Sequence, residues 1–146
     1  MRTAPQAITF LTTIYPEIDW RFDVELRPGC AGRYLFDEDP NEPAIIEIGF
    51  HSPAVGLMVV LHELGHYHDF QSFDDWRAFK DRPYETKETC AMEQGWRLVQ
   101  RHDLEHLVSR DRWDRFHYFI HDDREFESCA DYLAHLGITE EETCDV

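Results

Sequence analysis

The sequence lacks any apolar run that approaches a membrane span, which requires about 20 consecutive apolar residues. The segment from Met1 to Pro16 contains no long apolar stretch, and Arg2 is its only cation. A secretory signal peptide would combine a positively charged start with such a stretch. Both absences predict a soluble, cytoplasmic protein that does not enter a membrane.

Basic residues are also scarce. The chain has 14 lysines and arginines against 30 aspartates and glutamates, which gives a net charge of −16. A protein that binds nucleic acid needs a basic face for the phosphate backbone, so this composition argues against a nucleic-acid partner. The acidic excess chiefly predicts solubility, and it also suits a basic protein partner.

Closely spaced cysteine pairs are absent, since no C-x-x-C spacing occurs among Cys30, Cys90, Cys129 and Cys144. Zinc sites built from cysteine use such pairs, so a cysteine zinc site is not expected. In a reducing cytosol the four residues are interpreted as free thiols.

The chain is long enough for one domain, 1–146, and no repeat divides it. Strand-like alternation followed by helical periodicity predicts an α+β fold, with about three strands of an antiparallel or mixed sheet on a central helix and a helical C-terminal half. The expected helices are 4–14, 53–73, 84–101, one or two within 104–121, and 122–136. The expected strands are 20–26, 33–36 and 44–50, the first two forming a hairpin, while 74–83 is expected to be a charged connection and 139–146 a frayed tail.

An H-E-x-x-H pattern, from His62 to His66, lies at the end of a nearly continuous apolar run. The two histidines are four residues apart, so in a helix their rings lie on one face, one turn from each other. Ser52 and Pro53 suit a helix start before this run. Two imidazoles at this spacing bind zinc, and Glu63 then reaches a zinc-bound water as general base. The alternative interpretation is an amphipathic helix whose histidines are satisfied within the core.

A catalytic zinc ion usually has three protein ligands and one water molecule, so a third ligand is expected from a later helix. Glu88 and Glu127 are candidates, because each is followed three residues later by an alanine, Ala91 or Ala130. That alanine lies one turn along on the same helix face. A small residue there would let the later helix approach the motif helix closely enough for a glutamate to reach the metal.

The segment 62–66, followed by a helix with Glu-x-x-Ala, resembles the minimal gluzincins, in particular the ImmA/IrrE-type metallopeptidases of phages and bacteria. The resemblance covers roughly the sequence from Trp20 to Val99. It implies a zincin-like fold, in which the two motif histidines and a downstream glutamate bind zinc and the motif glutamate is the base.

The resemblance leaves three glutamates open as the third ligand. The interval from His66 to Glu88 is close to that in thermolysin-like enzymes, which favours Glu88. Glu127 begins the form Glu-x-x-Ala-Asp that these families use, whereas in the Glu88 segment Met92 stands in place of the final acid. Glu85 also lies near the expected interval, but no small residue follows it three positions on.

Other histidines and acids need separate interpretations. The segment 102–106 spells the inverted zinc motif H-x-x-E-H, but it lies among charges and is interpreted as an exposed polar stretch. His117 and His121, again four apart, are interpreted as a packed histidine face rather than a second metal site. Asp69, three residues beyond His66, has two interpretations: a carboxylate that orients a histidine ligand, or a surface carboxylate.

These features predict a zinc-dependent metallopeptidase that acts on a protein or peptide. Zinc would lower the pKa of its bound water, Glu63 would take the proton, and hydroxide would attack a peptide carbonyl. The strand 44–50 is the candidate to hold an extended peptide beside the metal, although another strand could serve. The candidate donors to the oxyanion are Tyr84, His117, Tyr118, His121 and Arg124.

Two rival predictions remain. One is a gluzincin-like domain, catalytically weak or inactive, that binds metal and regulates another protein by contact. The other is a structural zinc site, which would need a fourth protein ligand such as His68 or a cysteine.

Overall fold

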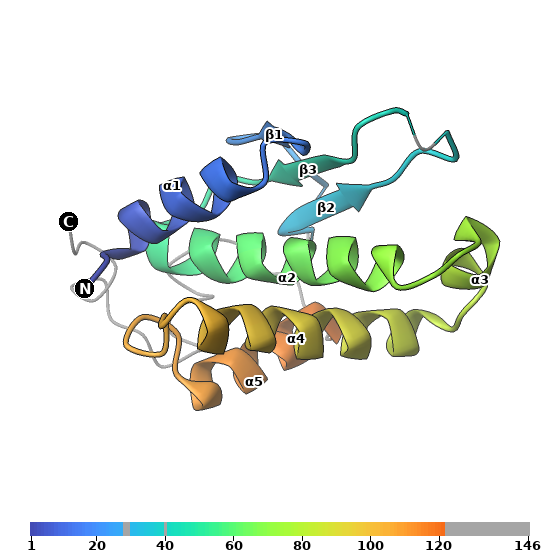
Figure 1. The fold of residues 1–146 in the computed structure, drawn as a ribbon. Coiled ribbons are helices and arrows are strands. Elements are labelled where there is room, and N and C mark those ends of the chain that lie inside the picture. Colours follow the sequence, from blue (N-terminus) through green and yellow to red (C-terminus); the bar gives the residue numbers. More distant parts are fainter. Residues whose placement is uncertain (28–29, 40, 122–146) are drawn as a thin grey trace.

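The computed structural model describes residues 1–27, 30–39 and 41–121, with the backbone alone described for 117–121. These residues form an α+β fold with five helices and one three-stranded mixed sheet (Figure 1). The helices are α1 (Ala4–Ile14), α2 (Pro53–Gln71), α3 (Trp76–Lys80), α4 (Tyr84–Arg101) and α5 (Arg110–His121), and the strands are β1 (Asp19–Arg21), β2 (Gly32–Leu35) and β3 (Ile45–Ile48). The predicted helix 122–136 and tail 139–146 lie outside the described residues.

Helix α2 lies in the middle of the molecule, between a layer of α1 and the sheet and a layer of α4 and α5 (Figure 1). Every residue of α2 from Val55 to Gly65 is buried. A helix that is apolar on all sides must be covered on all sides, which explains why this segment became the centre of the core. Among the described residues, no helix has the length and apolar character needed to cross a membrane.

Helix α1 covers the start of α2 and has the bounds that the sequence predicts. Its first turn is closed by a capping box: the Thr3 hydroxyl accepts from the Gln6 amide, and the Gln6 side chain accepts from the Thr3 amide. Ala7 and Leu11 are fully buried on the face toward the core. Local signals therefore suffice to define this helix.

The sheet is mixed, but its strand order differs from the predicted hairpin. The order is β1-β3-β2, with β1 parallel and β2 antiparallel to β3, so the hairpin predicted between the first two strands is wrong. Strand β1 ends at Arg21, and Asp23 then interrupts the extended backbone with a φ of 55°, a left-handed conformation, although the Val24 amide still donates to the carbonyl of Ile48. The isoleucine-rich β3 has the most buried residues of the three strands, which explains its central position.

One connection differs from its prediction, whereas the region after α4 agrees with the predicted one or two helices. The charged connection 74–83 contains the short helix α3, which Asp75 caps by accepting from the Arg77 amide and which buries Phe79. The region 104–121 forms one helix, α5, preceded by turns that place Leu104 and Val108 in the core.

Candidate metal centre

The two motif histidines lie on one face of α2, as their spacing predicts. Their ring centroids are 4.8 Å apart and the ring planes are nearly perpendicular. His62 is buried, and His66 is partly exposed toward a cleft. The helix therefore presents two imidazoles to one point in space.

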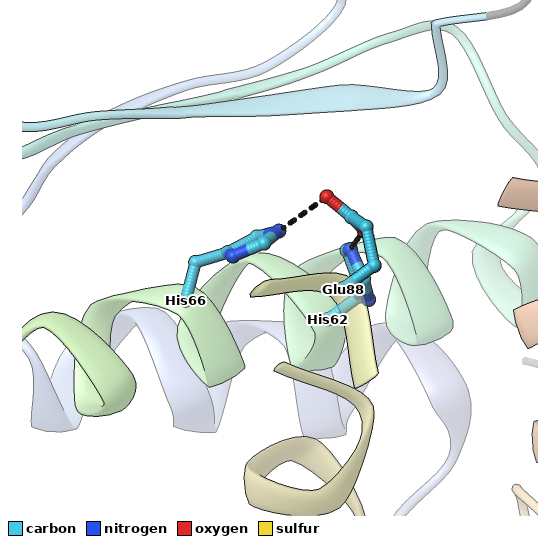
Figure 2. Close-up of side chains that lie close together, drawn as sticks. All are labelled: His62, His66 and Glu88. Atoms are coloured by element: carbon cyan, nitrogen blue, oxygen red, sulfur yellow. Dashed lines mark ion pairs between the residues drawn. The ribbon is translucent and has the colours of Figure 1, made fainter. Parts of the chain in front are cut away.

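Glu88 of α4 meets both rings (Figure 2). Its Oε2 lies 2.8 Å from Nε2 of His62, and its Oε1 lies 3.2 Å from Nε2 of His66. Glu88 is itself buried, with 7% of its surface exposed. Of the candidate third ligands, Glu85 is exposed on α4 and does not join this group, while Glu127 lies outside the described residues.

A close contact between α2 and α4 brings Glu88 to this position. A Cβ atom added to Gly65 would lie 2.0 Å from the carbonyl oxygen of Ala91. Gly65 therefore lets the backbones touch, and Ala91, one turn from Glu88, is fully buried at the contact. The small residue expected after the third ligand is present, and its partner is the glycine within the motif itself.

The charges of the three side chains depend on one another. Burial would raise the pKa of Glu88, but the two adjacent histidines hold it far below its ordinary value. Burial would lower the pKa of His66, but contact with Glu88 and the charges of Glu63 and Asp69 raise it overall. The cluster thus favours an ionised carboxylate between two imidazoles, the charge state in which a carboxylate binds metal.

The arrangement fits a bound metal ion. The donor atoms of His62, His66 and Glu88 all lie within 4.8 Å of one another, and no other such group occurs in the part of the chain that the structure describes. A tetrahedral ion with bonds of about 2.0 Å separates its ligand atoms by about 3.3 Å, close to the spacings observed here. The buried Oε2 of Glu88 also has no well-directed hydrogen bond among the described residues, despite its short distance to His62. These three side chains could therefore hold a metal ion.

Glu63 lies beside this group but is not part of it. It is buried, and burial raises the pKa of its carboxyl to about 7, an effect that His66 opposes and Glu88 reinforces. Gly32 of β2 packs near its side chain, because an added Cβ there would lie 3.4 Å from Cγ of Glu63. Glu63 is thus a carboxyl group that both gains and loses a proton near neutral pH.

A cleft of about 640 Å³ opens over the four side chains. One wall is β2 and the segment before it, and the other is the first turn of α4 with Tyr84 and Lys87. The wall strand is not the 44–50 segment that the sequence favours: β3 is the central strand, and β2 is the edge strand that lines the cleft. The misleading signal was proximity in sequence: β3 directly precedes α2, but both of its edges are paired with other strands.

Asp69 and the neighbour of His62 both differ from what the sequence predicts. Asp69 is buried and accepts a 2.5 Å hydrogen bond from Nη2 of Arg82, so it is not a surface carboxylate, and it acts on His66 through its charge. The neighbour of His62 is instead Met92, whose sulfur lies 3.2 Å from Nδ1. Met92 is the residue that departs from the Glu-x-x-Ala-Asp form, and here it packs against the ligand ring.

The remaining candidate residues are distributed as follows. His68 points away from the site and its Nε2 lies 2.6 Å from the Tyr15 hydroxyl, so it is not a fourth ligand. His106 is exposed, in agreement with the interpretation of 102–106, whereas His102 is half-buried against Phe10. Tyr84 lines the cleft. Arg124 and the side chains of His117, Tyr118 and His121 lie outside the described part of the chain.

Among the cleft residues that the sequence analysis did not identify are Tyr34 and Cys30. Tyr34 stacks on His66 with nearly parallel rings. Cys30 is a free thiol in the cleft wall, and Cys90 is a free thiol outside the cleft. The alternation along β2 contained the signal for Tyr34, because Gly32 and Tyr34 share the face toward α2. Without the strand order, that face could not be assigned to the metal centre.

Comparison with models of protein families, with curated proteins and with solved structures gives no match to this chain. Inferences about its function therefore rest on the geometry of its own residues.

Proposed function

We propose that this chain is a zinc-dependent metallopeptidase with a zincin-like site, similar to the minimal gluzincins. The observation that carries the proposal is the convergence of Glu88 on the two motif histidines, with a second buried glutamate beside them. Neither feature is expected if His62 and His66 were ordinary core histidines. A core histidine needs one hydrogen-bond partner, and it does not need two buried carboxylates.

His62, His66 and Glu88 would hold the metal. Two imidazoles and one carboxylate are a ligand set that suits zinc, and three protein ligands leave a position open to solvent or substrate. Bound there, zinc supplies a Lewis acid that activates a water molecule and polarises a peptide carbonyl. The partial exposure of His66 toward the cleft is consistent with an open rather than a closed site.

Glu63 would move the proton. A general base works best when its pKa lies near the working pH, and burial raises the pKa of Glu63 to about 7. Its carboxylate would accept one proton from water as the water oxygen bonds to the peptide carbonyl carbon. The same proton would then pass to the nitrogen of the leaving amine as the C–N bond breaks.

Strand β2 would position the substrate. It pairs with β3 on one side, and its other side borders the cleft along Gly32–Leu35. An extended peptide added at this edge would receive main-chain hydrogen bonds, as in other cases of strand addition. The absence of a side chain at Gly32 lets the strand lie close to α2, because an added Cβ would lie 2.6 Å from Cγ1 of Val59.

Cleavage of denatured casein by the zinc-loaded protein, with and without a chelator, tests this function. We expect the wild type to cleave casein and the chelator to stop cleavage. Glu63→Gln should retain stoichiometric zinc and lose at least about 100-fold in kcat, because loss of a general base typically costs 100- to 10,000-fold. Glu93→Gln, at an exposed position of α4, is the matched control and should keep full activity.

Two results would count against this proposal. Unchanged turnover in Glu63→Gln would refute the role of the base. Stoichiometric zinc without cleavage of casein would favour instead a metal-binding regulatory module, for which the net charge of −16 suits a basic protein partner.

A further inference from the structure

Both ring nitrogens of His62 face helix α4. Its Nε2 lies 2.8 Å from Oε2 of Glu88, and its Nδ1 lies 3.2 Å from the sulfur of Met92. Glu88 and Met92 are four residues apart, so they lie one turn from each other on the same face of α4. His62 and Met92 are both buried. One face of α4 therefore contacts the ring at each of its two nitrogens.

Met92 is held at this position by helix α5. Its carbonyl oxygen accepts a 3.0 Å hydrogen bond from Nε1 of Trp113, which is itself buried. The indole lies against α4, because a Cβ added to Gly95 would be 2.6 Å from a carbon of the Trp113 ring. The packing of α5 on α4 thus fixes the backbone from which the Met92 side chain reaches His62.

The contact at Nδ1 is chemically unusual for a metal-binding histidine. A histidine that binds a metal through one ring nitrogen donates the N–H of the other, almost always to an oxygen of a carboxylate, a backbone carbonyl or water. That hydrogen bond fixes the tautomer and the ring orientation, and it makes the ligand nitrogen more basic. A thioether sulfur is neutral and only a weak acceptor, so it supports the ring less strongly than an oxygen would.

We infer that Met92 is a positioning residue of the zinc centre, whose sulfur accepts a hydrogen bond from Nδ1–H of His62 and so keeps Nε2 directed at the metal position. This inference rests on the proposed function, since it takes His62 as a zinc ligand. Because sulfur is the weaker acceptor, this centre binds zinc less tightly than it would with an oxygen acceptor at the same position.

Two substitutions at Met92 test the inference in opposite directions. Met92→Leu nearly keeps the side-chain volume but removes the acceptor, whereas Met92→Gln has a similar length and supplies a carbonyl oxygen. Competition with a chromophoric chelator near neutral pH measures zinc affinity in the full-length proteins. We expect Met92→Leu to lower it by about 10-fold, at the lower end of the effect of such partners. Met92→Gln should bind zinc at least as tightly as the wild type.

Met58→Leu is the matched control. Met58 is also buried in α2, one turn before His62, and it lies outside the cleft lining. The same substitution there should keep zinc affinity within about threefold of the wild type, because exchange of Met for Leu nearly conserves volume. Proton NMR of the zinc-loaded proteins gives a second readout. The Nδ1–H resonance of His62 should move upfield in Met92→Leu and downfield in Met92→Gln, because a stronger hydrogen bond deshields the proton.

Zinc affinity also separates this inference from the proposed function. A zinc-loaded wild type that leaves casein intact would count against the peptidase, and the affinities would still decide the role of Met92. Equal zinc affinity of the wild type and Met92→Leu, or a wild type that binds no zinc, would overturn the inference. Met92→Gln that binds zinc as weakly as Met92→Leu, or an equal loss in Met58→Leu, would assign the effect to packing and overturn it as well.

Discussion

At the scale of single residues, the centre is a set of ionisable groups that would be costly to bury separately. Glu88 lies between two imidazoles, and this contact offsets the loss of hydration that burial of its charge entails. Oε2 of Glu88 nevertheless has no well-directed hydrogen bond among the described side chains. A metal ion would satisfy that oxygen, which explains why the cluster suits a ligand better than it suits the core alone.

The first prediction concerns Glu88 itself. Glu88→Gln keeps the shape of the side chain but removes its charge. Mutation of a residue that only supports a metal ligand lowers metal affinity about 10- to 100-fold, so loss of the ligand charge itself should lower zinc affinity by more than that. Metal analysis after dialysis against a weak chelator measures this loss. Glu85→Gln, on the exposed side of the same helix, is the control and should retain one zinc per chain.

Glu127→Gln completes the comparison, because Glu127 is the competing candidate in the sequence. Full zinc retention in Glu88→Gln together with loss in Glu127→Gln would transfer the third ligand to Glu127. Circular dichroism of each variant would show that the fold is retained.

At the scale of elements, the centre depends on how closely α2 and α4 approach. These two helices contribute all three candidate ligands, and Gly65 and Ala91 form their contact. The backbone of α4 lies directly against Gly65, so the position of Glu88 depends on the absence of a side chain there. Gly95 of α4 allows a second close approach, because an added Cβ would lie 2.9 Å from the carbonyl oxygen of Leu61. Elsewhere in α2, glycine has no such role.

Gly65→Ala tests this contact. The new methyl group would overlap the Ala91 carbonyl, which cannot move without separating the helices, so we expect a loss of at least about 3 kcal/mol in unfolding free energy. Gly56→Ala in the same helix is the matched control. Its nearest neighbour would be 3.7 Å away, and alanine there should stabilise by about 0.5–1 kcal/mol.

Urea unfolding of both variants in the presence of chelator measures the two values. If Gly65→Ala were as stable as Gly56→Ala, the close approach of α2 and α4 would be wrong. The position of Glu88 would then need another explanation.

At the scale of the whole molecule, buried ionisable groups make the stability of the metal-free protein depend on pH. Glu63 has a pKa of about 7 when folded, against an ordinary value of 4.5, so its ionisation destabilises the fold. Stability from Glu63 is fully present below its unfolded pKa and is lost as the pH rises through about 7. His66, whose folded pKa is also raised, loses its contribution in the same direction. Glu88, whose pKa is lowered, loses its contribution only under strongly acidic conditions.

The contribution of Glu63 to the unfolding free energy of the metal-free protein should therefore fall between about pH 5 and pH 8. His51, His68 and His102, whose pKa values are lowered by burial, act in the opposite direction, so the contribution of Glu63 is read from the difference between the wild type and a variant. Glu63→Gln removes the largest part of this dependence, worth up to about 3 kcal/mol at the alkaline end. Chemical unfolding of both proteins in chelator at the two pH values measures the difference. Equal pH dependence of stability in the wild type and in Glu63→Gln would show that Glu63 is not held in a desolvated position.

The sequence determined the features that depend on neighbouring residues. Helices 4–14 and 84–101 have the predicted bounds, and the motif helix begins at Pro53 and ends two residues before the predicted position. Their periodicity and end signals are local, so no distant contact is needed to recognise them. The pairing of His62 with His66 is equally local, because four residues in a helix always bring two side chains to one face.

Only the tertiary structure decided which distant residues join them. The order β1-β3-β2 reflects the depth at which each strand is buried, and the convergence of Glu88 rather than Glu85 reflects the contact of Gly65 with Ala91. Strand order and helix contact depend on how surfaces far apart in the chain pack together. The spacing of residues along one segment contains no information about that packing. Five consecutive residues were therefore enough to identify the candidate pair of metal ligands, whereas its third partner and the strand facing it could be identified only from the folded core.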